Sequence, residues 1–135
     1  MHLMRAVHDD VPRLAEMNWQ LIRDEGSDNA MTLEQLTVRM SEFLRASYDA
    51  WWMVENQHTV GYILVDMGKT PVYIRHFFVS APFRRRGYGR AAFALLLVEL
   101  RHVPLDVAVL NTNIPAVAFW QSVGFATRVY EMRRR

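Results

Sequence analysis

The sequence contains no cysteine. A chain without cysteine forms no disulfide, offers no thiol nucleophile and builds no zinc–thiolate site, so we expect no bound metal, and a cytoplasmic location is the simplest expectation. Long apolar runs are also lacking, since no stretch reaches the roughly 18 residues that a transmembrane helix needs. The first ten residues carry acidic side chains and no long apolar core, which is not the pattern of a signal peptide. We therefore expect no membrane partner.

A strong excess of one charge is missing as well. The chain has 16 Lys and Arg against 14 Asp and Glu, a formal net charge of +2, although the sequence pI is about 9.3. This excess is too small to predict a nucleic-acid partner on charge alone. The basic side chains that are present gather at residues 84–90 and 133–135, and the second group is expected to be a solvated tail.

The length of 135 residues and the apolar fraction of 51% are typical of one globular domain, residues 1–135. Periodicity and turn residues predict an α+β fold, a mixed, mostly antiparallel sheet of six to seven strands with four helices. The strands are expected at residues 3–7, 51–55, 60–66, 72–79, 105–110 and 125–132. The helices are expected from an acidic cap at Asp9-Asp10 to about residues 24–26, from a capping box at Thr32-Leu-Glu-Gln35, over residues 90–100, and from Asn113 to Gly124.

The most informative stretch follows the strand at 72–79 and reads Arg84-Arg-Arg-Gly87-Tyr88-Gly89-Arg90. Glycines allow the backbone to close around a bulky anion. The first N–H groups of the helix that follows have no intrahelical partner, and the helix dipole adds partial positive charge there. Together with the arginine side chains, these features predict a phosphate-binding site.

Two nucleotide-binding motifs also match in part. Gly87-x-Gly89-x-x-Ala92 fits the dinucleotide fingerprint, and Asp106 lies at about the expected distance. In a Rossmann unit, however, the glycine turn follows its strand almost directly and the acidic residue ends the next strand. Here residues 80–86 intervene, and Asp106 begins a strand. Gly68-Lys69-Thr70 has the end of a P-loop without its first glycine or its following helix. Both nucleotide interpretations are disfavoured, and a Rossmann-type nucleotide binder remains only as a rival.

A family resemblance explains the same stretch better. Arg84-x-x-Gly87-x-Gly89 after an apolar strand resembles the acyl-CoA-binding signature of the GNAT superfamily of N-acyltransferases. A second block, Asn113-x-x-Ala116-x-x-Phe119-Trp120-x-x-x-Gly124-Phe125, resembles the family's next motif. The two motifs occur in the family's order with a helix and a strand between them. The order of the other elements fits too, so the resemblance covers nearly the whole chain.

The resemblance implies a binding site for acetyl-CoA as co-substrate. The fourth and fifth strands would splay apart at their carboxyl ends, with the pyrophosphate on the N–H groups of residues 85–90 and the pantetheine amides on the strand edge. A backbone N–H there would stabilise the oxyanion, and Asn113 would contact the pantetheine arm besides capping its helix. The implied coenzyme-binding residues are Phe77, Phe78, Val79, Arg84, Arg85, Arg86, Gly87, Tyr88, Gly89, Arg90, Asn113, Phe119 and Trp120.

The residue that removes the proton from the attacking amine is open, because a free amine has a pKa of about 10.4. The family often places Glu on its central strand, where this chain has Arg75 and His76. Arginine stays protonated, so His76 is a candidate base, with a histidine packed in the sheet as the alternative. Glu25 is the other candidate. One branch, which modifies ribosomal-protein N-termini, uses Glu on the fifth strand, where this chain has Ala108.

The acid that protonates the leaving thiol is also open. Trp120 stands where the family usually has Tyr, and an indole supplies no proton at neutral pH. Ordinary thiols have a pKa of about 8.5, so the coenzyme could leave as a thiolate. Otherwise the hydroxyl of Tyr130 or Tyr88 could protonate it.

The loop between the first two helices usually sets acceptor specificity in the family. Here it carries Asp24 and Glu25, which would attract a cationic amine and are the predicted substrate-binding residues, with a solvated acidic loop as the alternative. The predicted function is transfer of the acetyl group of acetyl-CoA to a primary amine, small-molecule or peptide, by direct attack. A non-catalytic acyl-CoA-binding sensor or interaction module is the rival, and a homodimer is left open.

Overall fold

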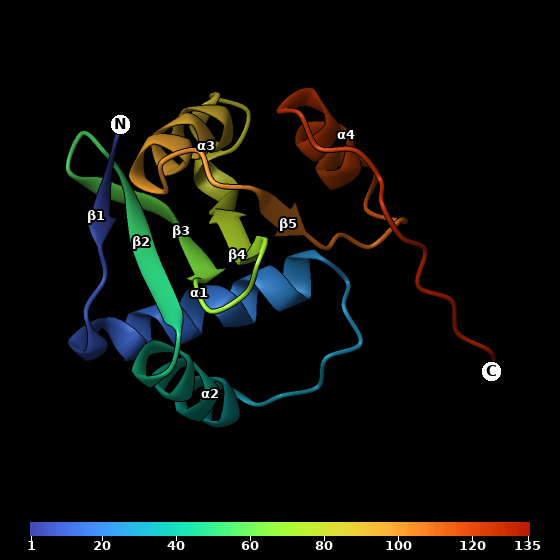
Figure 1. The fold of residues 1–135 in the computed structure, drawn as a ribbon. Helices are drawn as coiled ribbons and strands as arrows, with labels where there is room; N and C mark the ends of the chain where they lie inside the picture. The colour runs from blue at the N-terminus through green and yellow to red at the C-terminus, as the bar shows by residue number, and fades with distance from the viewer.

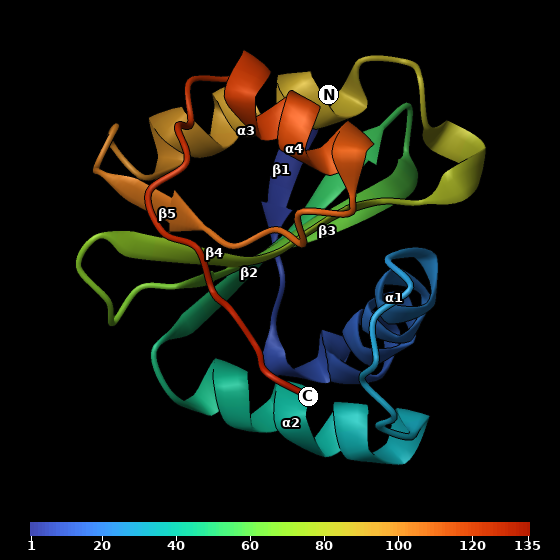
Figure 2. The same cartoon turned by 90° about the vertical axis from the view of Figure 1, so that its right-hand side faces the viewer.

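A five-stranded sheet lies between two pairs of helices in the computed structural model, which describes residues 1–135 (Figure 1). Figure 2 shows α3 and α4 on one face of the sheet and α1 and α2 on the other. The strands are β1 His2–Arg5, β2 Tyr48–Glu55, β3 His58–Asp66, β4 Val72–Val79 and β5 Leu105–Val107. The helices are α1 Val11–Asp24, α2 Leu33–Arg45, α3 Tyr88–Glu99 and α4 Ile114–Ser122, with short 3₁₀ turns at His8–Asp10 and Ala81–Phe83. None of them is both long and apolar enough to span a membrane.

The strands follow one another in sequence order, β1-β2-β3-β4-β5. All neighbours are antiparallel except β4 and β5, which run parallel. The β4–β5 pairing joins only Val72, Ile74 and the residue between them to β5. Beyond the bulge that follows Ile74, the rest of β4 has no neighbour on that side, which leaves the edge of β4 unpaired where the splay was predicted.

The sheet has a hydrophobic core on each face, because successive side chains of a strand point to opposite sides. On β3, Tyr62 and Leu64 pack into the core under α1 and α2. Ile63 and Val65, one residue along, pack into the core under α3 and α4. With both faces covered by helices, the middle of β2 and most of β3 are buried continuously. These two strands therefore form the buried centre of the sheet, and β4 pairs with the β3 edge of that centre.

Local sequence signals place most helix starts correctly. The Thr32 hydroxyl accepts a hydrogen bond from the Gln35 N–H, and the Gln35 side chain accepts one from the Thr32 N–H, which is the predicted capping box. Asn113 caps α4 by accepting from the Ala116 N–H. The predicted acidic cap of α1 does not form, because the Asp10 side chain makes no hydrogen bond to the first N–H groups of the helix. The Asp10 carboxylate accepts from the Val7 N–H and the Trp52 indole instead of from the helix.

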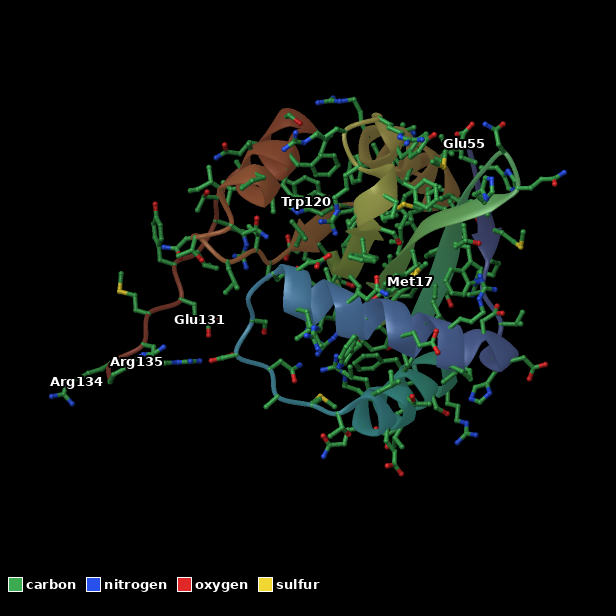
Figure 3. All side chains as sticks on the ribbon, turned by 180° about the vertical axis from the view of Figure 1, so that it is seen from behind. Met17, Glu55, Trp120, Glu131, Arg134 and Arg135 are labelled. Atoms are coloured by element: carbon green, nitrogen blue, oxygen red, sulfur yellow. The ribbon has the colours of Figure 1, made fainter.

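The predicted number of strands is wrong, since the sheet has five strands and not six or seven. Residues 125–132 form no strand, and β5 ends at Val107 instead of residue 110. A strand needs a neighbouring edge for its backbone groups and a core for one of its faces. The last residues have neither, since the side chains of Val129, Tyr130 and Met132 are largely exposed and the segment runs away from the sheet (Figures 1 and 3).

Candidate active site

The glycine loop forms the turn that carries the chain from β4 into α3. Gly87 has φ +78°, a left-handed conformation that favours glycine, and it is the residue from which α3 begins. Gly89 lies in the first turn of α3, where a Cβ would stand 3.4 Å from the Phe119 ring. The N–H groups of residues 85–90 make no hydrogen bond within the chain. A run of free donors at a helix start is a site for an anion.

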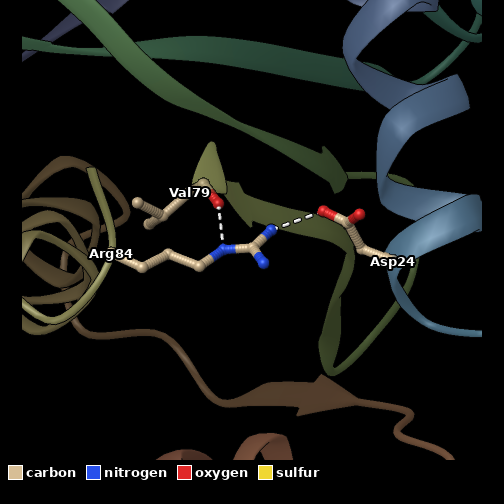
Figure 4. A network of polar contacts seen from close by, with 3 residues as sticks. All are labelled: Asp24, Val79 and Arg84. Atoms are coloured by element: carbon tan, nitrogen blue, oxygen red, sulfur yellow. Dashed lines mark hydrogen bonds and ion pairs between the residues drawn. The ribbon is translucent and has the colours of Figure 1, made fainter. Parts of the chain in front are cut away.

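The arginines of the loop have different roles. The Arg84 Nε donates to the Val79 carbonyl at 2.8 Å, and its Nη2 donates to the Asp24 carboxylate at 2.6 Å (Figure 4). The Arg84 side chain thus ties the loop to the end of β4 and to the end of α1. The Arg90 Nη2 donates to the Ser122 hydroxyl of α4 at 2.8 Å. No ion pair involves the side chains of residues 85 and 86, which leaves their charge available to a ligand.

The free edge of β4 lies next to the loop. The Ser80 N–H donates to the Val60 carbonyl of β3, and backbone groups of a strand alternate between its two sides. By this alternation Phe78 faces β3, whereas Phe77 and Val79 direct their N–H and C=O groups to the open side. The Val79 carbonyl already accepts from Arg84. The donors left on this edge are therefore the N–H groups of Phe77 and Val79.

Helix α4 closes the same side. Its Trp120 side chain is 7% exposed and packs against Phe77, Phe93 and Phe125 at ring-centroid distances of 5.1–5.8 Å. Figure 3 shows Trp120 on the side of α4 that faces the rest of the domain. Trp120 is thus a core residue that positions α4. The side-chain oxygen Oδ1 of Asn113 is used in capping, and its NH₂ group makes no hydrogen bond within the chain.

A cavity of about 240 Å³ lies on the other face of the sheet. Its walls come from α1, the loop after it, α2 and β4, through Asn18, Leu21, Ile22, Glu25, Ser27, Asn29, Arg39, Tyr73, Arg75 and His76. The register between β3 and β4 shifts where Leu64 pairs with His76 and Val65 with Ile74, which makes Arg75 the extra residue of a β-bulge. Bulges re-aim side chains, and this one brings the neighbours Arg75 and His76 to the same cavity. A larger groove, about 570 Å³, lies between the start of α1 and the second half of α2 and contains no β4 residue.

The two candidate bases stand in different environments within this cavity. Partial burial of the carboxyl in the cavity, and secondly the charge of Asp24, raise the pKa of Glu25 above its usual value, although the residue keeps an exposed surface. Burial lowers the pKa of His76 to about 3, and the charges of Arg39 and Arg75 add to the effect. The His76 Nδ1 is hydrogen-bonded to the Tyr62 hydroxyl at 3.0 Å. His76 is therefore a neutral, buried histidine at pH 7, which was the alternative to its role as a base.

The sequence-predicted residues are only partly brought together. Glu25 and His76 line one cavity, whereas the Asp24 carboxylate is paired with Arg84. Tyr130 lies on the C-terminal segment with 83% of its surface exposed, and it is not among the residues of the cavity. Tyr88 begins α3 and packs against the core on the opposite face of the sheet.

Asn18 and Arg39 are among the polar residues of the cavity that sequence reasoning missed. Asn18 is 1% exposed and stands on the buried stripe of α1, three residues before Leu21. Arg39 stands three residues after the buried Leu36 of α2. The sequence did contain a signal for both residues, namely a polar residue at a position of the helix that is normally occupied by an apolar core side chain.

Comparison with known proteins agrees with this geometry. The sequence model of the Acetyltransferase (GNAT) family matches residues 12–125. No curated protein matches the chain. A "possible acetyltransferase" from Clostridium difficile 630 has a similar structure, with a TM-score of 0.81 and 17% sequence identity over 99% of this chain and 95% of the other.

Two further solved structures are similar. A "predicted acetyltransferase with acetyl-CoA" from Clostridium acetobutylicum has a TM-score of 0.74 and 15% identity over 99% of this chain and 95% of the other. An acetyltransferase from Thermus thermophilus has a TM-score of 0.74 and 23% identity over 93% of this chain and 88% of the other. At these identities the structures establish the fold, and the match to the family model over most of the sequence establishes the family. The chain belongs to the GNAT family of acetyltransferases.

Proposed function

We propose that this protein transfers the acetyl group of acetyl-CoA to a primary amine by direct attack of the amine on the thioester. The observation that carries the proposal is the opening beside β4, which has free backbone donors on one side and a cavity containing a carboxylate on the other. The family uses acetyl-CoA, and one structural neighbour is described with acetyl-CoA.

The coenzyme half of the site would be built mainly from backbone. The free N–H groups of residues 85–90, with the side-chain charges of Arg85 and Arg86, would receive the diphosphate. The N–H groups of Phe77 and Val79 would pair with the pantetheine arm and stabilise the oxyanion. The NH₂ group of Asn113 and the Phe119 ring would border the arm. Arg84 would hold these parts in register and not contact the phosphates through its side chain.

In the reaction the neutral amine nitrogen forms a bond to the thioester carbonyl carbon, the carbon–sulfur bond then breaks, and the nitrogen releases one proton to solvent as the amide and the thiolate form. The ammonium must first lose a proton, and Glu25 is the better acceptor in this cavity. Protonating a histidine with a pKa of about 3 costs roughly 5 kcal/mol at pH 7. Glu25, with its raised pKa, is closer to the range of a useful base. His76 then lines the cavity as a packed side chain, hydrogen-bonded to the buried Tyr62 hydroxyl.

The sulfur would leave as a thiolate, since a thiol has a pKa of about 8.5 and needs no strong acid. Trp120 supplies no proton. A role for Tyr130 as the acid would require the exposed C-terminal segment to fold back over the site. Tyr88, the first residue of α3, is the tyrosine that lies in the glycine loop itself.

The rival is a protein that binds acyl-CoA without turning it over. The absence of a Tyr at position 120 favours it, because the family's usual acid is then missing. Incubation with acetyl-CoA and a panel of amines, followed by measurement of free thiol, distinguishes the two. Calorimetry with acetyl-CoA and with CoA tests the binding step alone, and the absence of binding at millimolar ligand would contradict both.

A further inference from the structure

The cavity between α1, α2 and β4 contains buried donors without partners. The Asn18 Nδ2 and the Arg39 Nε are both shielded from solvent and make no hydrogen bond. The Asn18 Oδ1 accepts from the Arg39 Nη2 at 3.0 Å, which fixes the orientation of the amide, because the opposite flip would set two donors against each other. Burial raises the pKa of the Tyr62 hydroxyl well above its usual value, and the nearby Asn18 amide offsets only part of this effect and does not reach hydrogen-bond geometry. Buried donors without partners are rare in native proteins, so an acceptor is missing here.

The same cavity holds two guanidinium groups without a counter-ion. Neither Arg39 nor Arg75 belongs to an ion pair. Both lie over the Phe43 ring, at 5.3 and 4.8 Å from its centroid, and the charge of Arg75 lowers the pKa of Arg39 in addition to the larger effect of burial. Two like charges held together on one ring repel each other, and an anion between them would remove the repulsion. A guanidinium is suited to a carboxylate because its N–H groups match the two oxygens.

The cavity also has an acidic side. Glu25 is the only carboxylate among its lining residues, and it forms no ion pair with either arginine. Positive and negative groups are therefore kept apart within one small volume. At about 240 Å³ the cavity is below the roughly 300–1,000 Å³ of sites for drug-sized ligands. This arrangement is complementary to a small molecule that carries opposite charges at its two ends.

We propose that the acceptor is a small amino acid or similar zwitterion, whose carboxylate is bound by Arg39, Arg75 and the Asn18 amide while its amine faces Glu25. This inference rests on the proposed function, since it names the substrate class of the same site. The carboxylate would supply the missing acceptor for the buried donors and the missing counter-ion for the arginines. The ammonium would lie next to the group that removes its proton.

The first test compares matched acceptors with the wild-type protein. Thiol release from acetyl-CoA is measured with a panel of amino acids, each beside its carboxamide, its decarboxylated amine and its aminophosphonate analogue. We expect kcat/KM to fall about tenfold or more when the carboxylate is removed, mainly through KM, because a charge-assisted contact is lost. Equal rates across each set would overturn the inference and leave the acetyltransferase standing. Preference for the aminophosphonates would overturn the carboxylate assignment.

The second test uses variants. Arg75→Gln should raise KM for the amino acid about tenfold and leave KM for its carboxamide nearly unchanged, whereas Arg13→Gln should change neither. Arg13 is a matched control, since it also stacks on an aromatic ring, that of Trp52, outside the cavity. An equal rise of KM for the amino acid and for its carboxamide would contradict the contact of Arg75 with the carboxylate. A fall of apparent kcat for both acceptors at unchanged KM would indicate a folding defect, and the wild-type comparison then decides.

If no amine is acetylated, the proposed function fails, and calorimetry of the same ligands in saturating CoA decides the inference separately. Binding of the amino acids but not of their carboxamides would support the cavity assignment, and binding of neither would overturn it.

Discussion

The two sides of β4 offer a ligand different kinds of chemical group. Toward α3 and α4, the groups available to a ligand are mostly backbone, namely the free N–H groups of residues 85–90 and the open edge of the strand. Toward α1 and α2, the groups are side chains of Asn18, Glu25, Arg39 and Arg75 that meet in one cavity. A backbone site tolerates many side chains but depends on φ and on local charge. A side-chain site depends on every residue that forms it.

This difference explains why the first side could be found by a motif. Glycines must stand at fixed spacings where the chain turns through a left-handed conformation or where two segments approach closely. The cavity has no such spacing, because its residues come from three separate stretches of the chain, 18–29, 39 and 73–76. The comparison between the two sides can be tested at several points.

The largest effect is expected from Gly87→Asp, which tests the backbone side. The residue has φ +78°, and a carboxylate there would repel the diphosphate next to it. We expect acetyl-CoA affinity to fall by at least about 100-fold in calorimetry. Gly124→Asp is the control, since φ is +105° there and it lies just after the end of α4. It should destabilise the fold but leave the affinity of the folded fraction intact, and equal loss of affinity in both would show that strain alone is responsible.

The next effect is expected from Glu25→Gln, which tests the side-chain side. Loss of a general base typically lowers kcat by roughly 10²–10⁴-fold, so we expect about 100-fold here, with acetyl-CoA affinity unchanged. Because a base must be deprotonated and the Glu25 pKa is raised, the rate of the wild type should increase with pH through a limb above the usual glutamate value. The variant should lack this limb.

An unchanged limb in Glu25→Gln would remove Glu25 from the mechanism. His76→Gln is the matched test of the other candidate, and we expect it to keep the acidic limb because a pKa of about 3 lies below the range of the assay.

A smaller effect concerns stability against pH. The pKa of His76 is about 3 in the folded protein and about 6.5 in the unfolded chain, so between these values the unfolded state binds more protons. The stability that neutral His76 contributes is complete above about pH 6.5 and is lost as pH falls toward 3, by roughly 1.4 kcal/mol per pH unit. Urea denaturation at a series of pH values from neutral down to about 4 measures this slope.

His76→Gln should flatten the slope, and His58→Gln, at an exposed position, should not. The raised pKa of Glu25 acts in the opposite direction, but it is present in all three proteins and cancels in the comparison. Parallel slopes for wild type and His76→Gln would contradict the low pKa of His76.

The smallest effect is expected at the contact that joins the two sides. The Arg84–Asp24 pair is partly exposed, so its coupling in a double-mutant cycle of Arg84→Gln and Asp24→Asn should be within about 1 kcal/mol. Acetyl-CoA affinity should fall a few-fold more in Arg84→Gln than in Asp24→Asn, because only Arg84 also binds the Val79 carbonyl. A large equal loss in both would indicate that the pair itself holds the coenzyme site.

Much of the fold was predictable because its signals are local. The Thr32 capping box, the strand at 72–79 and the Gly87 turn each depend on residues close in sequence, and all three are confirmed. The strand at 125–132 was predicted as the last element, after the helix that ends at Gly124, and it does not form. A strand requires a neighbouring strand to pair with and a core to cover one of its faces. The three-residue β5 offers too short an edge for pairing, and the exposed Val129 side chain contacts no core.

The sequence by itself determined the order of the elements from β1 to α4, the glycine turn at the start of α3 and the family, since each follows from residue types at short fixed spacings. Only the tertiary structure decided that the Arg84 side chain is used to bind the protein itself, that His76 is held neutral, and that Asn18, Arg39 and Arg75 share one cavity with Glu25. The physical reason is that charge, burial and hydrogen bonding depend on which groups are brought together in space. The hydrogen-bonded partners Asn18 and Arg39 stand 21 positions apart along the chain, and Asp24 and Arg84 stand 60 apart.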